Sequence, residues 1–219
     1  MTLARRLVAE ALGTALLLAI VVGSGIMGER LAAGNVAIAL LANALATGAG
    51  LLAIIFMFGP ISGAHFNPVV TLSEAWQKNM PASEVLPYIL VQVVGAVAGV
   101  VAAHGMFGVP LLEVSEHVRS GPAQWWSEFV ATFGLIAVII ACNRSRPTIT
   151  PVAVAAYITS AYWFTASTSF ANPAVTLARS ITDTFAGIRP GDAPAFIVAQ
   201  LLGATAATLV FGWLYPRSR

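Results

Sequence analysis

Two Asn-Pro steps are the residues whose types and spacing could do chemistry. They are Asn67, Pro68 and Val69 in HFNPVVTL, and Asn172, Pro173 and Ala174 in FANPAVTL. A proline at the first position of a helix gives up no hydrogen bond that the helix needs, and an asparagine before it can cap the helix. Each motif therefore predicts a helix start. The apolar pieces that follow, about 68–77 and 173–181, would rise only ~15 Å, half a bilayer.

The elements that position these motifs are predicted to be membrane helices. Of the 219 residues, 58% are hydrophobic and 9% are charged, whereas a soluble domain carries about a quarter charged residues. The formal net charge is +2, and no run of basic residues is long enough to follow phosphates, so we expect no nucleic-acid partner. The lone cysteine, Cys142, cannot form a disulfide within the chain.

Apolar stretches of roughly the ~20 residues that cross hydrocarbon recur six times. They cover 7–27, 35–58, 85–107, 125–142, 148–166 and 193–215. The first has no clean small-residue cleavage site, so it is read as a retained helix and not a signal peptide. The distribution of basic residues predicts cytoplasmic N- and C-termini. The inner segments hold Arg5, Arg6, Lys78, Arg144, Arg146, Arg217 and Arg219, and the outer loops hold Arg30, Arg119 and Arg189. The short loops favour a prokaryotic plasma (inner) membrane.

An internal repeat organises these spans within a single domain, 1–219. Glu10 and Glu128 lie 118 residues apart, the two asparagines 105, and Gln92 and Gln200 108. The halves, about 1–109 and 122–219, each contain three full spans. An odd number of spans reverses the orientation of the second half, so the pattern predicts an inverted repeat.

Inverted symmetry brings the two half-helix starts together from opposite faces. Their positive dipole ends would meet near the midplane, where the asparagine amides can donate to a passing solute. Irregular backbone at this depth is tolerated only where protein buries it or water lines it. The loops ISGAHF and TASTSFA should therefore offer carbonyls to a narrow, water-filled path that suits neutral, hydrogen-bonding molecules.

The motifs resemble those of the aquaporin (major intrinsic protein) family. SGAHFNPVVTL is similar to the first signature loop, with Val69 where alanine is usual, and ANPAVTL resembles the second. The resemblance extends over nearly the whole chain. It implies an all-α membrane protein, a right-handed bundle of six transmembrane helices with two re-entrant half-helices. It also implies a homotetramer in which each protomer has its own pore.

One departure from the family concerns selectivity. Most members have an arginine after the second motif, in the outer constriction, and this chain has Val175. An isopropyl group in place of a guanidinium removes donors and a fixed charge, so we expect a wider and more apolar opening. Counting from the asparagines places the other filter positions near Thr47, Ser160 and Ser169, with Tyr157 and Ala161 as alternatives to Ser160.

Other polar residues have a structural and a functional interpretation. Arg179, one turn after Val175, could restore positive potential at the outer mouth or interact with terminal carbonyls and solvent. His65 could line the cytoplasmic vestibule or pack. Each membrane glutamate is expected to accept hydrogen bonds from the loop before a half-helix and not to couple ions, with a glutamine assisting. These residues are Glu10, Glu128, Gln92 and Gln200. His104 and His117 read as surface or interface residues, and no metal or cofactor is implied.

We therefore expect a passive channel for small uncharged solutes, such as glycerol, urea or a metalloid hydroxide like arsenous acid, together with water. The expected partners are these solutes, membrane lipid and further copies of the chain. A water-selective aquaporin is the alternative, and an ion-coupled secondary transporter or a structural role is less favoured. An enzyme is not expected, because Ser62 and His65 lack a third orienting group.

Overall fold

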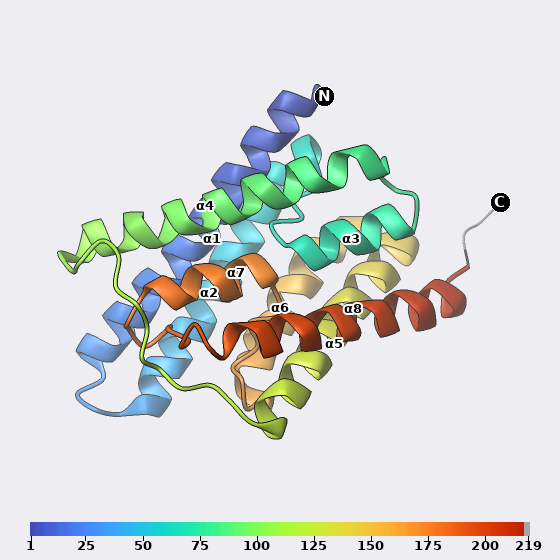
Figure 1. The fold of residues 1–219 in the computed structure, drawn as a ribbon. Coiled ribbons are helices and arrows are strands. Elements are labelled where there is room, and N and C mark those ends of the chain that lie inside the picture. Colours follow the sequence, from blue (N-terminus) through green and yellow to red (C-terminus); the bar gives the residue numbers. More distant parts are fainter. Residues whose placement is uncertain (217–219) are drawn as a thin grey trace.

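The computed structural model describes residues 1–216 as helices joined by loops, with no strand in that range (Figure 1). The first half contains α1 (Leu3–Leu31), α2 (Val36–Ser62), α3 (Pro68–Trp76), η1 (Ala82–Glu84) and α4 (Val85–Phe107). The second contains α5 (Pro122–Ser145), η2 (Pro147–Ile149), α6 (Thr150–Phe164), α7 (Pro173–Ala178), η3 (Arg179–Ile181) and α8 (Ala193–Leu214). Arg217 and Arg219, used above for orientation, lie outside the described residues.

The long helices confirm the predicted membrane architecture. Five of the described helices are long and apolar enough to cross a bilayer, and large apolar side chains cover their outward faces. The fifth expected span, 148–166, is shorter than predicted: α6 has 15 residues and is preceded by the 3-10 turn η2. An asparagine cap at Asn35 and a left-handed glycine at Gly63 mark the ends of α2.

The two halves pack in the same way. In the first half α1 packs on α4 and α2, and in the second α5 packs on α8 and α6. Both main pairs approach closely at glycines that are 108 residues apart. A Cβ at Gly95 would lie 2.3 Å from the Ala11 carbonyl oxygen, and one at Gly203 would lie 2.4 Å from that of Phe129. Such distances leave no room for a side chain at either seam.

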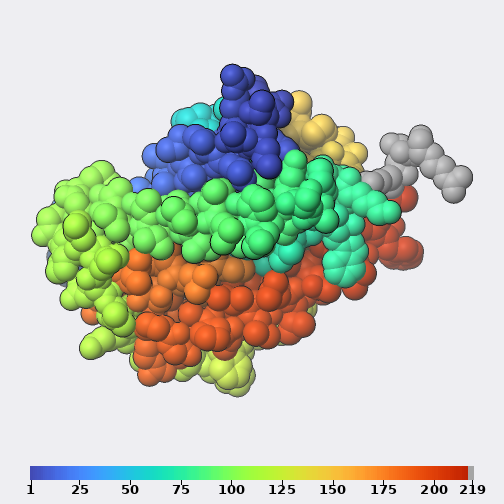
Figure 2. Space-filling view, turned by 45° about the horizontal axis from the view of Figure 1, so that its top comes forward, coloured from blue at the N-terminus to red at the C-terminus, as the bar shows by residue number. Residues whose placement is uncertain are grey.

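The half-helices lie inside the bundle. Both α3 and α7 run between α4 and α8, and they contact each other (Figure 1). In Figure 2, α4 crosses one face of the molecule, with α1 on one side and the orange and red residues of α7 and α8 on the other. The predicted second half-helix, 173–181, is an α-helix to Ala178 and a 3-10 turn to Ile181.

The start of α1 and the end of α8 lie at the same end of the bundle. Near the N-terminus, Arg6 forms an ion pair with Glu84, which comes directly before α4. Near the other terminus, Arg144 donates to the Gly212 carbonyl at 3.3 Å and to Gln77, after α3, at 2.6 Å. The segments after α3, before α4, after α5 and at the end of α8 thus form one rim.

Candidate functional site: a cavity between two capped half-helices

The loops before α3 and α7 have matching backbone conformations. Gly63, Ala64 and Phe66 have φ angles of 92°, 52° and 49°, and Thr168, Ser169 and Ala171, each 105 residues later, have 62°, 54° and 48°. Residues other than glycine rarely adopt these left-handed backbone angles. Repeated departures at equivalent positions mark segments that the surrounding structure holds in place.

The membrane glutamates hold these loops. Glu10 accepts from the backbone nitrogens of His65 and Phe66 at 2.9 and 2.7 Å, and from Ser62 Oγ at 2.7 Å. Glu128 accepts from the backbone nitrogens of Phe170 and Ala171, both at 2.9 Å. Both glutamate side chains are fully buried. A carboxylate with this many donors stabilises backbone that has no helical partner.

The buried glutamines complete the same arrangement. Gln92 donates to Glu10 at 2.8 Å and to Thr71 Oγ1 at 3.0 Å. Gln200 donates to Glu128 at 2.6 Å and to Thr176 Oγ1 at 2.8 Å. The two threonines belong to α3 and α7, so each glutamine links a loop anchor to a half-helix.

The asparagines cap their own half-helices and bind the opposite loop. Asn67 Oδ1 accepts from Val69 N at 3.0 Å, and Asn172 Oδ1 accepts from Ala174 N at 3.0 Å and Val175 N at 3.3 Å. The amide nitrogens cross over: Asn67 donates to the Ala171 carbonyl and Asn172 to that of Phe66, both at 2.8 Å. Each amide retains a second N–H, and both asparagines line the cavity.

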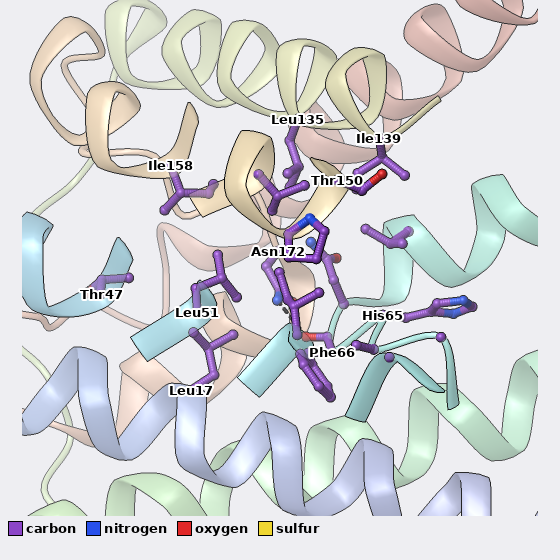
Figure 3. Close-up of a pocket in the computed structure, with 18 of the residues that line it drawn as sticks. Leu17, Thr47, Leu51, His65, Phe66, Leu135, Ile139, Thr150, Ile158 and Asn172 are labelled. Atoms are coloured by element: carbon purple, nitrogen blue, oxygen red, sulfur yellow. Dashed lines mark hydrogen bonds between the residues drawn. The ribbon is translucent and has the colours of Figure 1, made fainter. Parts of the chain in front are cut away.

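A cavity of about 590 Å³ passes along these asparagines. Figure 3 shows Asn172 near its middle, with Thr47 and Ile158 on one side and His65 and Thr150 on the other. Its walls are mainly apolar and include Leu17, Val21, Leu51, Ile55, Leu135, Ile139, Val154 and Ile158. We call its two ends the Val175 end and the His65 end.

The Val175 end combines apolar and hydroxyl groups. Thr47, Tyr162, Ser169 and Val175 all line it. Thr47 Oγ1 and the Tyr162 hydroxyl lie 3.2 Å apart. The buried Ser169 hydroxyl has no hydrogen-bond partner among the described residues. This unused hydroxyl lies in a residue of the cavity wall, with its oxygen buried.

The structure places the other expected filter positions elsewhere. Ser160 is exposed and bonds to the Tyr157 carbonyl, Tyr157 bonds to α5 carbonyls, and Ala161 is fully buried. None of them is among the described residues that line the cavity, and α6 contributes Tyr162 and Ile158 instead. The count back from Asn172 missed this because it crosses the irregular loop between α6 and α7, where helical spacing does not hold.

Two arginines lie close to one aromatic ring at the Val175 end. Arg179 is 2% exposed, lines the cavity and donates through Nε to the Ala186 carbonyl. Its guanidinium carbon lies 3.4 Å from the centre of the Phe170 ring, and that of Arg119 lies 5.1 Å away. Arg119 donates to the carbonyls of Gly187, Ser167 and Phe185. Burial lowers the pKa of Arg119 to about 10.

The His65 end carries a different set of groups. His65 lines the cavity, its Nδ1 lies 3.1 Å from Thr71 Oγ1, and its ring centre lies 5.4 Å from that of Tyr88. Glu74, which also lines this end, accepts from Asn79 at 2.6 Å. The sequence interpretation missed Glu74, although the 105-residue offset that relates the asparagines also relates Glu74 to Arg179.

His104 corrects an expectation, because it is buried and not on the surface. Its Nδ1 lies 2.6 Å from the Pro110 carbonyl oxygen, and its Nε2 lies 2.7 Å from Thr182 Oγ1. It ties the loop between α4 and α5 to the segment after η3. His117 is exposed. Residues 1–216 contain no group of histidine, cysteine and acidic side chains that could hold a metal ion.

Comparison with known proteins gives consistent matches. The model of the family described as "Major intrinsic protein" matches residues 1–166 and 147–219. Aquaglyceroporin AqpS of Rhizobium meliloti (strain 1021) is 55% identical over 217 residues, covering 99% of this chain and 93% of its own. Aquaporin AqpM of Methanothermobacter marburgensis is 31% identical over 243 residues, covering 97% and 98%. The structure of the aquaglyceroporin from Plasmodium falciparum superposes with a TM-score of 0.70 at 20% identity, covering 98% and 96%.

Proposed function

The chain belongs to the major intrinsic protein family, and from that premise we propose that it is a passive membrane channel for glycerol, other small uncharged solutes and water. Its relatives named above are an aquaglyceroporin and an aquaporin, and both align over nearly the whole chain. It is an integral membrane protein by family and by its apolar helices. We assign it no enzymatic activity.

The observation that carries this proposal is the single cavity that includes residues of both ends and the asparagine pair. Its apolar walls offer little to an ion, while the two asparagine amides and the hydroxyls of Thr47, Tyr162 and Ser169 can replace the hydrogen bonds that a solute gives up to water. Such a path suits molecules with several hydroxyl or amide groups and no charge.

Val175 favours solutes larger than water. A valine at this position leaves an apolar wall beside Ser169 and Thr47. The carbon face of a solute can contact this wall while its polar face exchanges hydrogen bonds with the hydroxyls. Glycerol and urea have this amphipathic character. Arsenous acid, a neutral trihydroxide, presents hydroxyls in a similar volume, and we include it in the proposed substrate class.

The glutamates argue against ion coupling. Transporters that move ions place carboxylates where the ion can reach them. Glu10 and Glu128 are fully buried and are occupied by loop and glutamine donors. We therefore propose gradient-driven passage with no coupled ion.

We further propose the membrane setting. The rim near both chain ends includes Arg6 and Arg144, so we place the His65 end on the cytoplasmic side and the Val175 end outside. A homotetramer with one pore in each protomer, in a prokaryotic plasma membrane, follows from family resemblance. The large exposed apolar side chains on the helices provide the surface for lipid and for neighbouring protomers.

Stopped-flow light scattering on proteoliposomes tests the proposal. Water efflux is compared with uptake of glycerol, urea and arsenous acid for the wild type, Val175→Arg and Val175→Leu. The arginine adds bulk and charge, and the leucine adds bulk alone. We expect the arginine to slow solute uptake by about tenfold or more, ~1.4 kcal/mol of barrier, and water efflux by less.

Three results would contradict the proposal. Water efflux without solute uptake by the wild type would identify a water-selective channel narrowed by residues other than Val175. Equal losses of water and solute flux in Val175→Arg would show that this position does not discriminate by solute size. Solute uptake that requires an imposed proton or sodium gradient would point to a coupled transporter.

A further inference from the structure

Arg179 is a buried charge that forms no direct ion pair with a carboxylate among residues 1–216. The ion pairs found among residues 1–216 are Arg6 with Glu84 and Arg189 with Asp192, and neither includes Arg179 or Arg119. A buried guanidinium without a carboxylate is costly, and most proteins avoid one. Here the cost is offset by carbonyl oxygens and by the face of Phe170.

The side chain of Arg179 lies at the wall of the cavity, against the Phe170 ring. Only its Nε hydrogen bond, to the Ala186 carbonyl, is formed with a described residue. The two terminal nitrogens retain their donors, and Arg179 lines the cavity with Val175 and Ser169. The guanidinium thus lies at the cavity wall with donors that no described residue accepts.

We propose that Arg179, supported by Arg119, is the cation-excluding residue of this channel, one helical turn farther out than Val175. This inference rests on the proposed channel function and identifies its charge filter. Val175 sets the width of the opening, and the arginine pair sets its potential. Because the two properties belong to different positions, the opening can admit bulky neutral solutes and still repel cations.

The local environment supports this division. The two guanidinium groups share Phe170, which lies directly before Ala171 and Asn172. Arg179 lines the cavity, and Arg119 lies against the same ring without lining the cavity. The carboxylate of Glu128 lies behind this loop and is occupied by the backbone nitrogens of Phe170 and Ala171. In a low-dielectric opening, the repulsion between a positive side chain and an entering cation extends over a longer distance than it does in water.

Urea and guanidinium form a matched pair of probes, since both are planar and similar in size and only guanidinium is charged. Uptake of each into proteoliposomes is measured for the wild type, Arg179→Gln, Arg179→Lys and Arg189→Gln. Glutamine keeps polarity and most of the length, lysine keeps the charge, and Arg189 belongs to the same end but does not line the cavity.

We expect the wild type to admit urea and exclude guanidinium. The ratio of guanidinium to urea uptake should rise about tenfold or more in Arg179→Gln, the lower range of what a charged cleft does to local ion concentration. It should stay near the wild-type value in Arg179→Lys and Arg189→Gln. Val175→Arg combined with Arg179→Gln should restore exclusion, because it returns a charge to the opening.

Several results would overturn the inference. An unchanged ratio in a folded Arg179→Gln channel would assign cation exclusion to the asparagine pair alone. If that variant does not fold, guanidinium uptake by the wild type at the rate of urea would reject the charge filter without any variant. Wild-type vesicles that take up neither urea nor glycerol would remove the proposed function, and this inference with it.

Discussion

At the His65 end of the cavity α3 presents Val70 and Glu74, and at the Val175 end α7 presents Val175 and Arg179, each pair four residues apart. The residues are equivalent in the repeat, yet one end carries an acid and the other a base. The pore is thus symmetric in its backbone, while its two ends carry side-chain charges of opposite sign. The electrostatic asymmetry lies in single side chains.

The aromatic contacts behind the loops repeat this relation. His65 contacts Tyr88 with ring centres 5.4 Å apart, and the equivalent Phe170 contacts Phe196 at 5.2 Å. We call the residues that hold the two loops and half-helices the frame. These residues are the same in both halves: Glu10 and Glu128, Gln92 and Gln200, Asn67 and Asn172, and Pro68 and Pro173. Among the residues that line the cavity, the two asparagines match between the halves, whereas His65 and Phe170 differ, as do Glu74 and Arg179.

The frame should fail when either glutamate is altered. We expect Glu10→Gln and Glu128→Gln to lower the midpoint of thermal unfolding in detergent strongly, because an amide turns a donor toward backbone N–H groups. A buried donor left unpaired costs ~1–3 kcal/mol, and several are affected. Glu29→Gln, at an exposed position near the end of α1, is the control. A similar midpoint in all three variants would contradict the structural role.

Substitutions at the two helix seams should have the next largest effect on stability. Gly95→Ala and Gly203→Ala place a Cβ against the carbonyl oxygens of Ala11 and Phe129, and such overpacking costs ~1–3 kcal/mol. Both variants should lower the unfolding midpoint by similar amounts, because the seams are equivalent. Gly105→Ala, whose Cβ would meet only Leu111 at 4.0 Å, should not. A loss confined to one seam would show that the halves do not share their packing.

These frame residues are the ones that the sequence could predict. Few structural interpretations fit a proline at a helix start, an asparagine before it and paired glutamates in apolar spans. The spacing of these residues also repeats in the two halves. Tyr162 and Arg119 could not be found in that way. Tyr162 depends on the register of α6, which the irregular loop before α7 determines, and Arg119 lies in a loop held by hydrogen bonds to distant backbone groups.

Removing the Ser169 hydroxyl should change the rate of solute uptake by a smaller amount. Ser169 has a left-handed φ angle, and alanine should tolerate that angle about as well as serine does. Ser169→Ala therefore removes only a hydroxyl that has no partner among the described residues. A single hydrogen bond contributes ~0.5–1.5 kcal/mol, so glycerol uptake should slow roughly two- to tenfold while water efflux changes less. Ser160→Ala, on the exposed face of α6, should leave both fluxes unchanged. The reverse result would restore the filter position counted from Asn172.

The charge at the Val175 end should be insensitive to pH near neutrality. Burial lowers the pKa of Arg119 only to about 10, so this group stays protonated at pH 8. Partial desolvation of the exposed His117 ring, and then the charges of Arg119 and Arg179, lower the pKa of His117, so this imidazole gains no charge as the pH rises from 6.5 to 8. The wild-type ratio of guanidinium to urea uptake should therefore be constant between pH 6.5 and 8. An increase in the ratio across that interval would mean that a histidine, and not the arginine pair, supplies the excluding charge.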